Sequence, residues 1–355
     1  MKREVFKIVP RGREFGTMGY YCRITFYMIL VAYLQYQWMT QVSTLTLAIS
    51  FGMAKALIGL NIMHDANHGS ISRKTWINDI LGFAMDYIGG QKWFWILGHT
   101  THHAYTNNQF KDPDGFAAEP LLLFNNYEPT HPKRKFFHKF QNWYFLPTLS
   151  FLWIKSITNQ HIITLQHPGA SKAGINMKNE FIQRRCKYAV ATRILYLLCN
   201  IVCPLYHAAH AHQIVSTVGH ILSMGFIASL LMASIIALSH NNELVTRDPL
   251  KSYRETGKPI CWFQSQVETS TTYGGFIAGA LTGGLNFQIE HHMFPRMNSA
   301  HYPYIAPTVR AVCKKHGIHY GYYPWVWQNL ISTMRYIRKV GCEEFWTNPW
   351  THGEF

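Results

Sequence analysis

The chain has 355 residues and a formal net charge of +15, yet only 14% of its residues are charged, against 48% hydrophobic and 15% aromatic. This composition excludes an intrinsically disordered chain, which combines low hydrophobicity with dense charge. Seven cysteines without a Cys-x-x-Cys pair argue against a disulfide-stabilised secreted protein and against a structural zinc ribbon. Twenty histidines outnumber the 18 acidic residues, and this excess needs a specific explanation.

The positive charge indicates a polyanionic partner, either nucleic acid or an anionic membrane surface. Basic residues gather in three stretches, 2–13, 133–135 and 178–187, and long apolar runs follow the first and the third. Each stretch alone could be a solvated face. The chain has no nucleic-acid-binding motif, and the basic stretches flank apolar runs. We therefore expect the chain to interact with membrane lipids and not with nucleic acid.

Four apolar segments are predicted to cross the bilayer, for which about 20 residues are needed. They form two hairpins: 24–39 with 44–63, and 188–206 with 214–238. The connections within the hairpins, at 40–43 and 207–213, hold no Lys or Arg, whereas the open ends hold many. Positive charge marks the cytosolic side, so the open ends and both termini are expected in the cytosol.

Two further apolar stretches, 76–97 and 143–157, are interrupted by charged residues, glycines or proline. They are expected to lie in the membrane interface, with a membrane crossing as the alternative. No small-residue cleavage site follows the first apolar run, which argues against a signal peptide. We therefore expect an all-α membrane protein of about four transmembrane helices with interfacial helices. A basic cytosolic N-terminal arm over 1–23 would precede one membrane-embedded domain over 24–355.

Histidines are concentrated in four groups at the ends of the apolar segments. The groups comprise His64 and His68; His99, His102 and His103; His291 and His292, preceded by Gln288; and His240. Spacings of three and four residues place side chains on one face of a helix, so several imidazoles can reach one metal ion. Eight imidazoles exceed what one ion binds, so two metal ions are expected. Imidazole suits iron, zinc and copper.

The alternative for each group is an unliganded interface cluster. A single pair of histidines four residues apart is more often such a cluster than a metal site. Three related strings together with His240, all at the expected cytosolic ends of membrane segments, are hard to produce by chance. By contrast, His207, His210 and His212 lie in the opposite loop and are expected to be solvated.

The three strings resemble the histidine boxes of the membrane fatty acid desaturases: His-Asp-x-x-His at 64–68, His-x-x-His-His at 99–103 and Gln-x-x-His-His at 288–292. Glutamine at the start of the third box is specific to the front-end branch, which inserts a double bond between an existing one and the carboxyl end. The similarity covers about residues 2–340. It includes flanking tracts at 63–69, 102–107, 112–114, 283–288 and 292–297.

Within that branch, the tracts 262–307 and 314–336 are most similar to delta-5 desaturases of diatoms and related protists. The resemblance implies a cytosolic histidine-box cap that holds two iron ions and uses O₂ and two electrons to form a cis double bond. An unactivated C–H bond has no acidic proton for a general base, so no catalytic residue is expected beyond the metal centre. The substrate would be a polyunsaturated acyl lipid or acyl-CoA. A shift of one methylene costs little energy, so regioselectivity is not settled by sequence.

Polar residues beside the boxes are candidates for orienting the ligand imidazoles by hydrogen bonds, or for ordinary helix caps and turns. They are Asp65, Asn67, Asp112 and Asp114. Asn241 is a candidate for holding a water near the metals. Gln288 would either bind iron through its carbonyl oxygen or shape the site.

Front-end desaturases usually carry an N-terminal cytochrome b5 domain with a His-Pro-Gly-Gly motif. The similar string here, His167-Pro168-Gly169-Ala170, lies mid-chain and is interpreted as a turn. The chain is therefore expected to be a fragment of such a fusion or to use a separate cytochrome b5 as electron donor, with 133–135 as candidate docking residues. The endoplasmic reticulum membrane is the expected location.

Two alternative functions stay open at this point. A related di-iron lipid hydroxylase would use the same metal centre, because one oxidant can either deliver a hydroxyl group or remove a second hydrogen. A non-catalytic metal-binding membrane protein, such as a zinc-holding receptor or an inactive remnant, would need only the histidines. The intact boxes argue against an inactive remnant.

Overall fold

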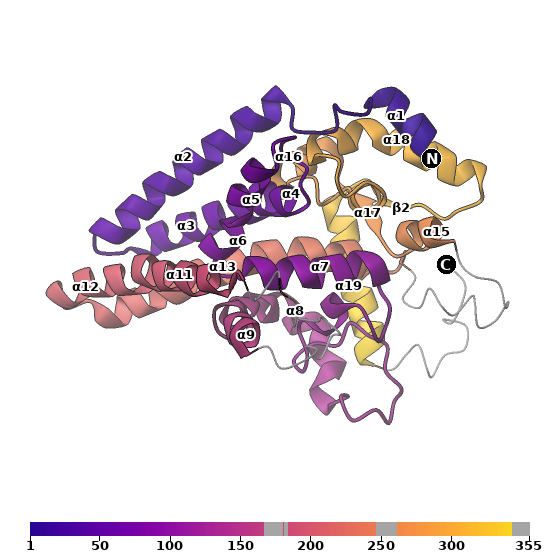
Figure 1. Ribbon diagram of the computed structural model, residues 1–355. Coiled ribbons are helices and arrows are strands. Elements are labelled where there is room, and N and C mark those ends of the chain that lie inside the picture. The colour runs from indigo at the N-terminus through magenta and orange to yellow at the C-terminus, as the bar shows by residue number, and fades with distance from the viewer. Residues whose placement is uncertain (167–179, 181–183, 246–260, 343–355) are drawn as a thin grey trace.

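The computed structural model describes residues 1–166, 180, 184–245 and 261–342, and these are mostly helical, as predicted (Figure 1). The string His167-Pro168-Gly169-Ala170 lies outside the described residues, as does Lys178 of the third basic stretch. Among the described residues, a single two-stranded parallel sheet joins β1 (Thr271–Tyr273) to β2 (Gly321–Tyr323).

Three helical stretches of the described residues are long and apolar enough to cross a membrane: Leu45–Asn67, Lys187–His210 and Ile214–His240. The first and second each contain one π-helical turn, and the third is the continuous helix α13 (Ile214–His240). The first consists of α3 (Leu45–Ile58), η1 (Gly59–Met63) and α4 (His64–Asn67), and the second of α11 (Cys186–Leu197), η4 (Leu198–Val202) and α12 (Cys203–His210). These stretches confirm three of the four predicted spans as apolar helices.

The remaining predicted span, 24–39, lies inside the 23-residue helix α2 (Met18–Thr40). It begins at the cap residue Thr17, whose hydroxyl accepts a hydrogen bond from the Tyr20 backbone N–H at 3.2 Å. Trp38 is buried against the core, whereas Ile29 is 65% exposed, as expected for a lipid-facing side chain. Because α2 is not among the three apolar candidates, its crossing of the membrane stays a prediction.

The stretch 76–97 is broken into short helices, which agrees with its interrupted sequence. These are α5 (Thr75–Gly82), α6 (Ala84–Tyr87) and the start of α7 (Lys92–Tyr105). Gly89, between α6 and α7, has φ +106°, a left-handed conformation that favours glycine. The stretch 143–157 forms parts of α8 (Gln141–Ser150) and α9 (Leu152–Gln166). Neither stretch is among the three candidate spans.

The remaining helices form a cap at the end of the spans that carries His64 and His240 (Figure 1). It comprises α1 (Lys2–Ile8), η2 (Pro113–Phe116), η3 (Phe136–Phe140), α15 (Trp262–Glu268), α16 (Gly275–Thr282), α17 (Gln288–Met293), η5 (Ser299–His301), α18 (Tyr302–Lys315) and α19 (Val326–Gly341). Helix α1 packs on α18, and Val5 is fully buried in a core shared with Ile305 and Val309. The predicted N-terminal arm is therefore anchored to the cap, and its last residues belong to α2.

Candidate metal centre

All eight predicted histidines converge, from α4 and the residue directly after it, from α7, from α17 and from the end of α13. Five of them are buried, and His68, His99 and His103 are half-buried. Seven of them form two clusters, within each of which the candidate donor atoms all lie within 4.8 Å of one another. The first cluster contains His64, His68, His99 and His291, and the second contains His102, His240 and His292. Each cluster draws on residues from at least three helices, so it forms only when the chain folds.

His103 lies between the two clusters. Its Nε2 atom is 3.1 Å from Nε2 of His99 and 2.9 Å from Nε2 of His291. Its ring stacks on the ring of His292 in the second cluster, with centroids 4.3 Å apart. The eighth histidine thus joins the clusters.

The π-helical turn η1 sets the position of His64 at the end of the first apolar helix. The Asn61 side-chain amide donates to the Leu57 carbonyl at 3.1 Å, and the Tyr20 hydroxyl donates to the Asn61 carbonyl at 2.7 Å. Gly283 has φ +65° and lies so close that a Cβ atom would be 2.0 Å from the Leu60 carbonyl oxygen. Only glycine fits there, and this close contact holds the turn in place.

In four of the histidines, Nδ1 is held by a protein oxygen. The pairs are His102 with the Asp112 carboxylate at 2.9 and 3.0 Å, His240 with the Thr269 carbonyl at 2.9 Å, His291 with the Tyr302 hydroxyl at 3.1 Å, and His292 with the Gln266 side-chain oxygen at 2.8 Å. A proton on Nδ1 leaves the lone pair on Nε2, which then serves as a metal ligand. These contacts orient the imidazoles as in known metal sites.

Two further observations indicate that these residues are suited to bind metal ions. Within the described part of the chain, both ring nitrogens of His64 and Nε2 of His68 are buried without a hydrogen-bond partner, which is costly unless something binds them. Burial, reinforced by neighbouring imidazoles, lowers the pKa of His99, His103 and His291 well below the ordinary histidine value. These imidazoles are therefore neutral at pH 7, which is the form that binds metal.

Gln288 lies against the second cluster, with its side-chain nitrogen 3.0 Å from Nε2 of His240 and 3.3 Å from Nε2 of His292. Among the described atoms, its side-chain oxygen is buried and has no hydrogen-bond partner. The two ends of an amide are assigned from their surroundings, and a half-turn would exchange them. Either assignment leaves a polar atom of Gln288 facing the imidazoles of this cluster.

Of the predicted orienting residues, Asp112 contacts a histidine directly. Its carboxylate bonds to His102 and also accepts the backbone N–H groups of Asn107 at 2.7 Å and Asp114 at 3.0 Å. Asp114 lies farther away, with a carboxylate oxygen 3.6 Å from Nδ1 of His102. Asp112 is therefore positioned to hold His102, whereas Asp114 is too far from Nδ1 for a hydrogen bond.

The other two predicted orienting residues, Asp65 and Asn67, mainly tether α4 to the cap and to α5. The Asp65 carboxylate accepts hydrogen bonds from Asn298 at 3.1 Å and Ser299 at 2.7 Å. It is 3.6 Å from Nδ1 of His64. Asn67 donates to the Gly82 carbonyl at 3.2 Å. These bonds fix the helix that carries the first box.

Asn241 lies in the wall of a cavity of about 100 Å³ that also touches His102, Asp112 and His240. Its side-chain nitrogen donates to the Ala237 carbonyl at 3.0 Å, whereas its oxygen is buried and has no partner among the described residues. A water needs room and several polar partners, and this cavity offers both. The predicted role of Asn241 fits this position.

Sequence reasoning missed Gln266, Thr269, Tyr302 and Trp95. The indole of Trp95 stacks on the His99 ring with centroids 4.3 Å apart. Gln266, Thr269 and Tyr302 come from segments without a box, and only the fold brings them to the histidines. The histidines expected to be solvated lie elsewhere, in the last turn of α12 and directly after it: His210 and His212 are exposed, whereas His207 is half-buried.

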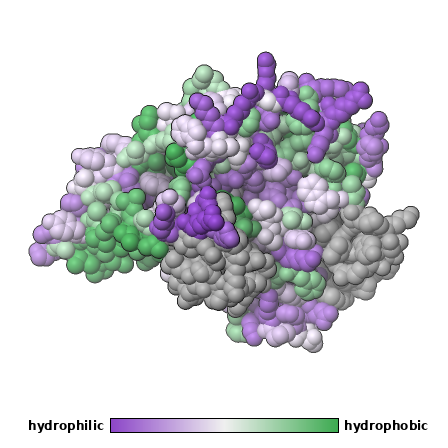
Figure 2. Space-filling model, in the orientation of Figure 1, coloured by the Kyte–Doolittle hydropathy of each residue, from purple (hydrophilic) through white to green (hydrophobic). Residues whose placement is uncertain are grey.

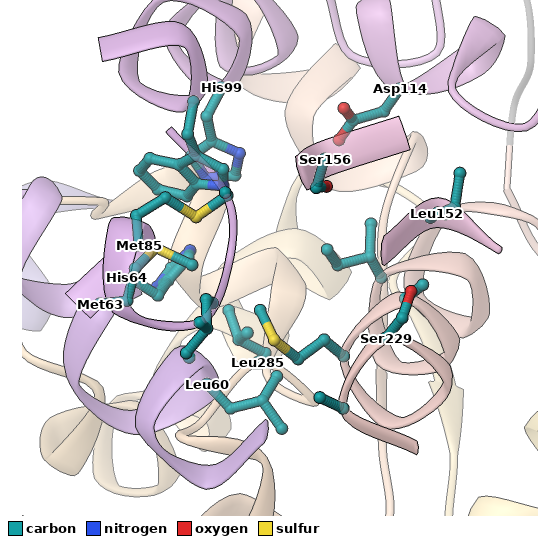
Figure 3. A pocket seen from close by; sticks show the side chains of 18 of the residues that line it. Leu60, Met63, His64, Met85, His99, Asp114, Leu152, Ser156, Ser229 and Leu285 are labelled. Atoms are coloured by element: carbon teal, nitrogen blue, oxygen red, sulfur yellow. The ribbon is translucent and has the colours of Figure 1, made fainter. Parts of the chain in front are cut away.

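A second, larger cavity of about 170 Å³ adjoins both clusters (Figure 3). His64 and His99 lie on one side of it, and Leu152, Ser156 and Ser229 on the other (Figure 3). Most of its lining is apolar, with residues of η1, α7, α9 and α13. An apolar cavity that ends at paired histidine clusters suits an apolar ligand.

Residues 36–324 match the family model described as fatty acid desaturase. The chain belongs to the fatty acid desaturase family. It is 34% identical over 302 residues to the acyl-lipid (7-3)-desaturase of Rebecca salina and 31% identical over 340 residues to that of Diacronema lutheri. It is also 32% identical over 298 residues to the chloroplastic acyl-lipid (7-3)-desaturase of Chlamydomonas reinhardtii.

These alignments cover 83%, 95% and 82% of the chain, respectively. They cover 63%, 73% and 55% of the three relatives' own lengths. The chain thus spans only part of the length of each of these three relatives.

Proposed function

We propose that this protein is a front-end fatty acid desaturase that introduces a cis double bond into polyunsaturated acyl chains. The observation that carries the proposal is the apolar cavity whose wall contains members of both histidine clusters. The reaction would take two hydrogens from neighbouring methylenes and combine them with O₂, two electrons and two protons to give two waters. Family membership supports the reaction class.

We propose that the two clusters hold two iron ions. One ion would be held by His64, His68, His99 and His291. The other would be held by His102, His240 and His292, together with Gln288. His103, which lies between the two clusters, would be a ligand as well. Bound iron would supply the one-electron chemistry that reduces O₂ and removes hydrogen from unactivated methylenes. No side chain besides the ligands is assigned a chemical step.

The other residues would position the imidazoles and the substrate. The Asp112 carboxylate would accept a hydrogen bond from Nδ1–H of His102, and the Thr269 carbonyl one from Nδ1–H of His240. The Nε2 atom of each ring is then left free for the metal. Trp95 covers the His99 ring and restricts its rotation. The apolar walls of the cavity exclude water and hold the acyl chain beside the clusters.

Gln288 at the start of the third box supports the front-end type. We propose delta-5 as the position of the new bond, the position printed in the name of a relative from Dictyostelium discoideum that is 25% identical. The relatives named acyl-lipid desaturases favour a lipid-bound substrate over acyl-CoA.

Expression in yeast fed with defined polyunsaturated acids tests the proposal. We expect a product with one more cis double bond, and its position, found by mass spectrometry of derivatised acids, identifies the regioselectivity. A hydroxylated product would favour the lipid hydroxylase instead. No new product from any acid, with the protein present in membranes, would contradict desaturase activity.

We propose that the protein resides in the endoplasmic reticulum membrane with both termini and both histidine clusters in the cytosol. If α2 crosses together with the three apolar candidates, the number of spans is even and the termini share one side. Protease treatment of sealed microsomes should therefore cleave tags at both ends. Protection of one tag would mean that α2 does not cross or that one of the broken stretches, 76–97 or 143–157, does.

We propose cytochrome b5, as a protein separate from residues 1–355, as the electron donor. Two of the candidate docking residues have structural partners: Lys133 pairs with Glu119 at 2.7 Å, and Arg134 donates to the Val340 carbonyl at 2.8 Å. The hydrophilic surface around α1 and α18 is the stronger candidate, because Lys314 and Lys315 are exposed there (Figure 2).

An acidic donor steered to a basic surface should respond to salt, since charges are screened beyond about 8–10 Å at physiological ionic strength. Activity in a host without cytochrome b5 should fall sharply and return when it is supplied. Raising the ionic strength of microsomes should slow turnover more at limiting than at saturating donor. Full activity without cytochrome b5 would point to another carrier.

A further inference from the structure

The larger cavity runs deep along α13. Its lining on this helix extends from Ile236, one turn before His240, down to Ala228. His240 lies twelve positions after Ala228, which corresponds to about 18 Å at a rise of 1.5 Å per helical residue. On the first apolar helical stretch the lining stops at Gly59 of η1, only five residues before His64. The deep end of the cavity therefore lies between α13 and α9.

The indole of Trp153 closes this deep end. Gly225 lies one turn below Ala228 on α13, and a Cβ atom there would be 2.3 Å from the Trp153 ring. Trp153 thus occupies the space over Gly225 into which the cavity would otherwise continue. The indole is 5% exposed and is itself part of the cavity wall.

Its neighbours hold the Trp153 side chain in this position. The indole N–H donates to the Tyr196 hydroxyl at 3.0 Å, and the Phe226 ring packs edge-on with centroids 6.2 Å apart. Tyr196 is itself buried and packs against Gly89, where a Cβ atom would be 3.0 Å from its hydroxyl oxygen. A ring held from both sides is a fixed wall and does not adapt to each ligand.

The chemistry of the deep end selects the methyl end of an acyl chain. A carboxyl or ester group there would need hydrogen-bond partners to offset its burial. Of the two serines in the wall, Ser229 already donates to the Leu149 carbonyl at 2.8 Å. The hydroxyl of the other, Ser156, accepts a hydrogen bond from the Gln160 side chain at 3.2 Å, and the remaining side chains, including Met232 and Trp153, are apolar.

We propose that Trp153 is the specificity residue that limits how many carbons lie between the reacting methylenes and the methyl end. The proposal rests on the desaturase function proposed above. Because the indole is fixed, a chain that is two carbons too long cannot seat its reacting carbons beside the histidine clusters. Differences of one methylene in a rigid apolar pocket are worth roughly 10- to 200-fold in specificity.

The test is a competition among polyunsaturated acids with the same double bonds near the carboxyl end. Each acid in the series is two carbons longer than the one before. Trp153→Ala should raise the preference for the longer acids at least about tenfold. Gly225→Ala should do the opposite, because its methyl group pushes the indole toward the histidines. If Trp153→Ala does not accumulate in membranes, Trp153→Phe replaces it.

Two control variants match these changes. Trp143→Ala removes a tryptophan that is 78% exposed, and Gly219→Ala adds a methyl group on α13 where nothing lies within 4 Å. Both should keep the wild-type length preference. A Trp153→Ala profile identical to that of Trp143→Ala, or a shift of Gly225→Ala toward longer acids, would overturn the proposal.

A binding measurement separates this proposal from the proposed function. The same acids, added to purified protein in detergent, should raise its melting temperature most at one chain length, and Trp153→Ala should move that optimum to longer acids. This readout requires no turnover. If no variant desaturates any acid but the optimum still moves, the desaturase assignment fails while the role of Trp153 stands. An unmoved optimum overturns the role of Trp153.

Discussion

Replacing His103 by alanine is expected to reduce the desaturated product by at least about 100-fold while the protein stays in the membrane. Loss of a group that only orients a metal ligand already lowers metal affinity or activity by about 10- to 100-fold. His103 is expected to be a ligand itself, so its loss should cost more. Its Nε2 lies 2.9 and 3.1 Å from Nε2 of His291 and His99, between the two clusters. Product analysis and immunoblots of membrane fractions give both quantities.

His210→Ala is the matched control, because this histidine is exposed at the far end of α12. Its variant should keep wild-type activity within about twofold, as exposed substitutions far from a site usually do. Retained activity in His103→Ala, or an equal loss in both variants, would contradict the assignment of His103 to the metal centre.

Replacing Asp112 by asparagine is expected to weaken iron binding by about 10- to 100-fold. The carboxylate only accepts hydrogen bonds and therefore keeps the proton on Nδ1 of His102. An amide of the same shape can also donate, so the ring is no longer held with Nε2 free for the metal. Iron retained after dialysis against a graded chelator measures the change.

Asp114→Asn provides the comparison, since its carboxylate is 3.6 Å from the same Nδ1 atom and is partly exposed. Its effect on iron retention should be clearly smaller than that of Asp112→Asn. Wild-type retention in Asp112→Asn, or a larger loss in Asp114→Asn, would show that the contact with His102 does not hold the metal site together.

Local spacing predicted which histidines share a helix, because positions three and four apart return to the same face. It did not predict which histidines share a cluster. His99 belongs to the first cluster and His102 to the second, although both lie on α7. Each helical residue turns the chain by about 100°, so residues three apart differ by about 60° and can face two neighbouring clusters.

The consecutive residues His291 and His292 also belong to different clusters. Their side chains point about 100° apart around α17. Which cluster each ring joins depends on how α4, α13 and α17 meet, and this is a tertiary property. The contacts of Gln266 and Thr269 with histidines could not be predicted for the same reason, since both residues lie in a segment that carries no histidine.

Helix prediction was most accurate where apolar runs were long and uncharged, as in α13. In α2, polar and aromatic residues interrupt the apolar face, so the helix is present but its membrane crossing is less evident. The docking of α1 escaped prediction because a seven-residue basic helix carries little periodic signal. Its buried Val5 is explained only by the facing residues of α18.

The most direct test of the central claim is the metal content of purified protein, measured by elemental analysis together with Mössbauer spectroscopy of ⁵⁷Fe-grown material. If the two histidine clusters are the metal centre, the protein should hold two irons per chain. The His64→Ala and His102→Ala variants should each lose iron. One zinc per chain, or two irons that survive both substitutions, would contradict the account.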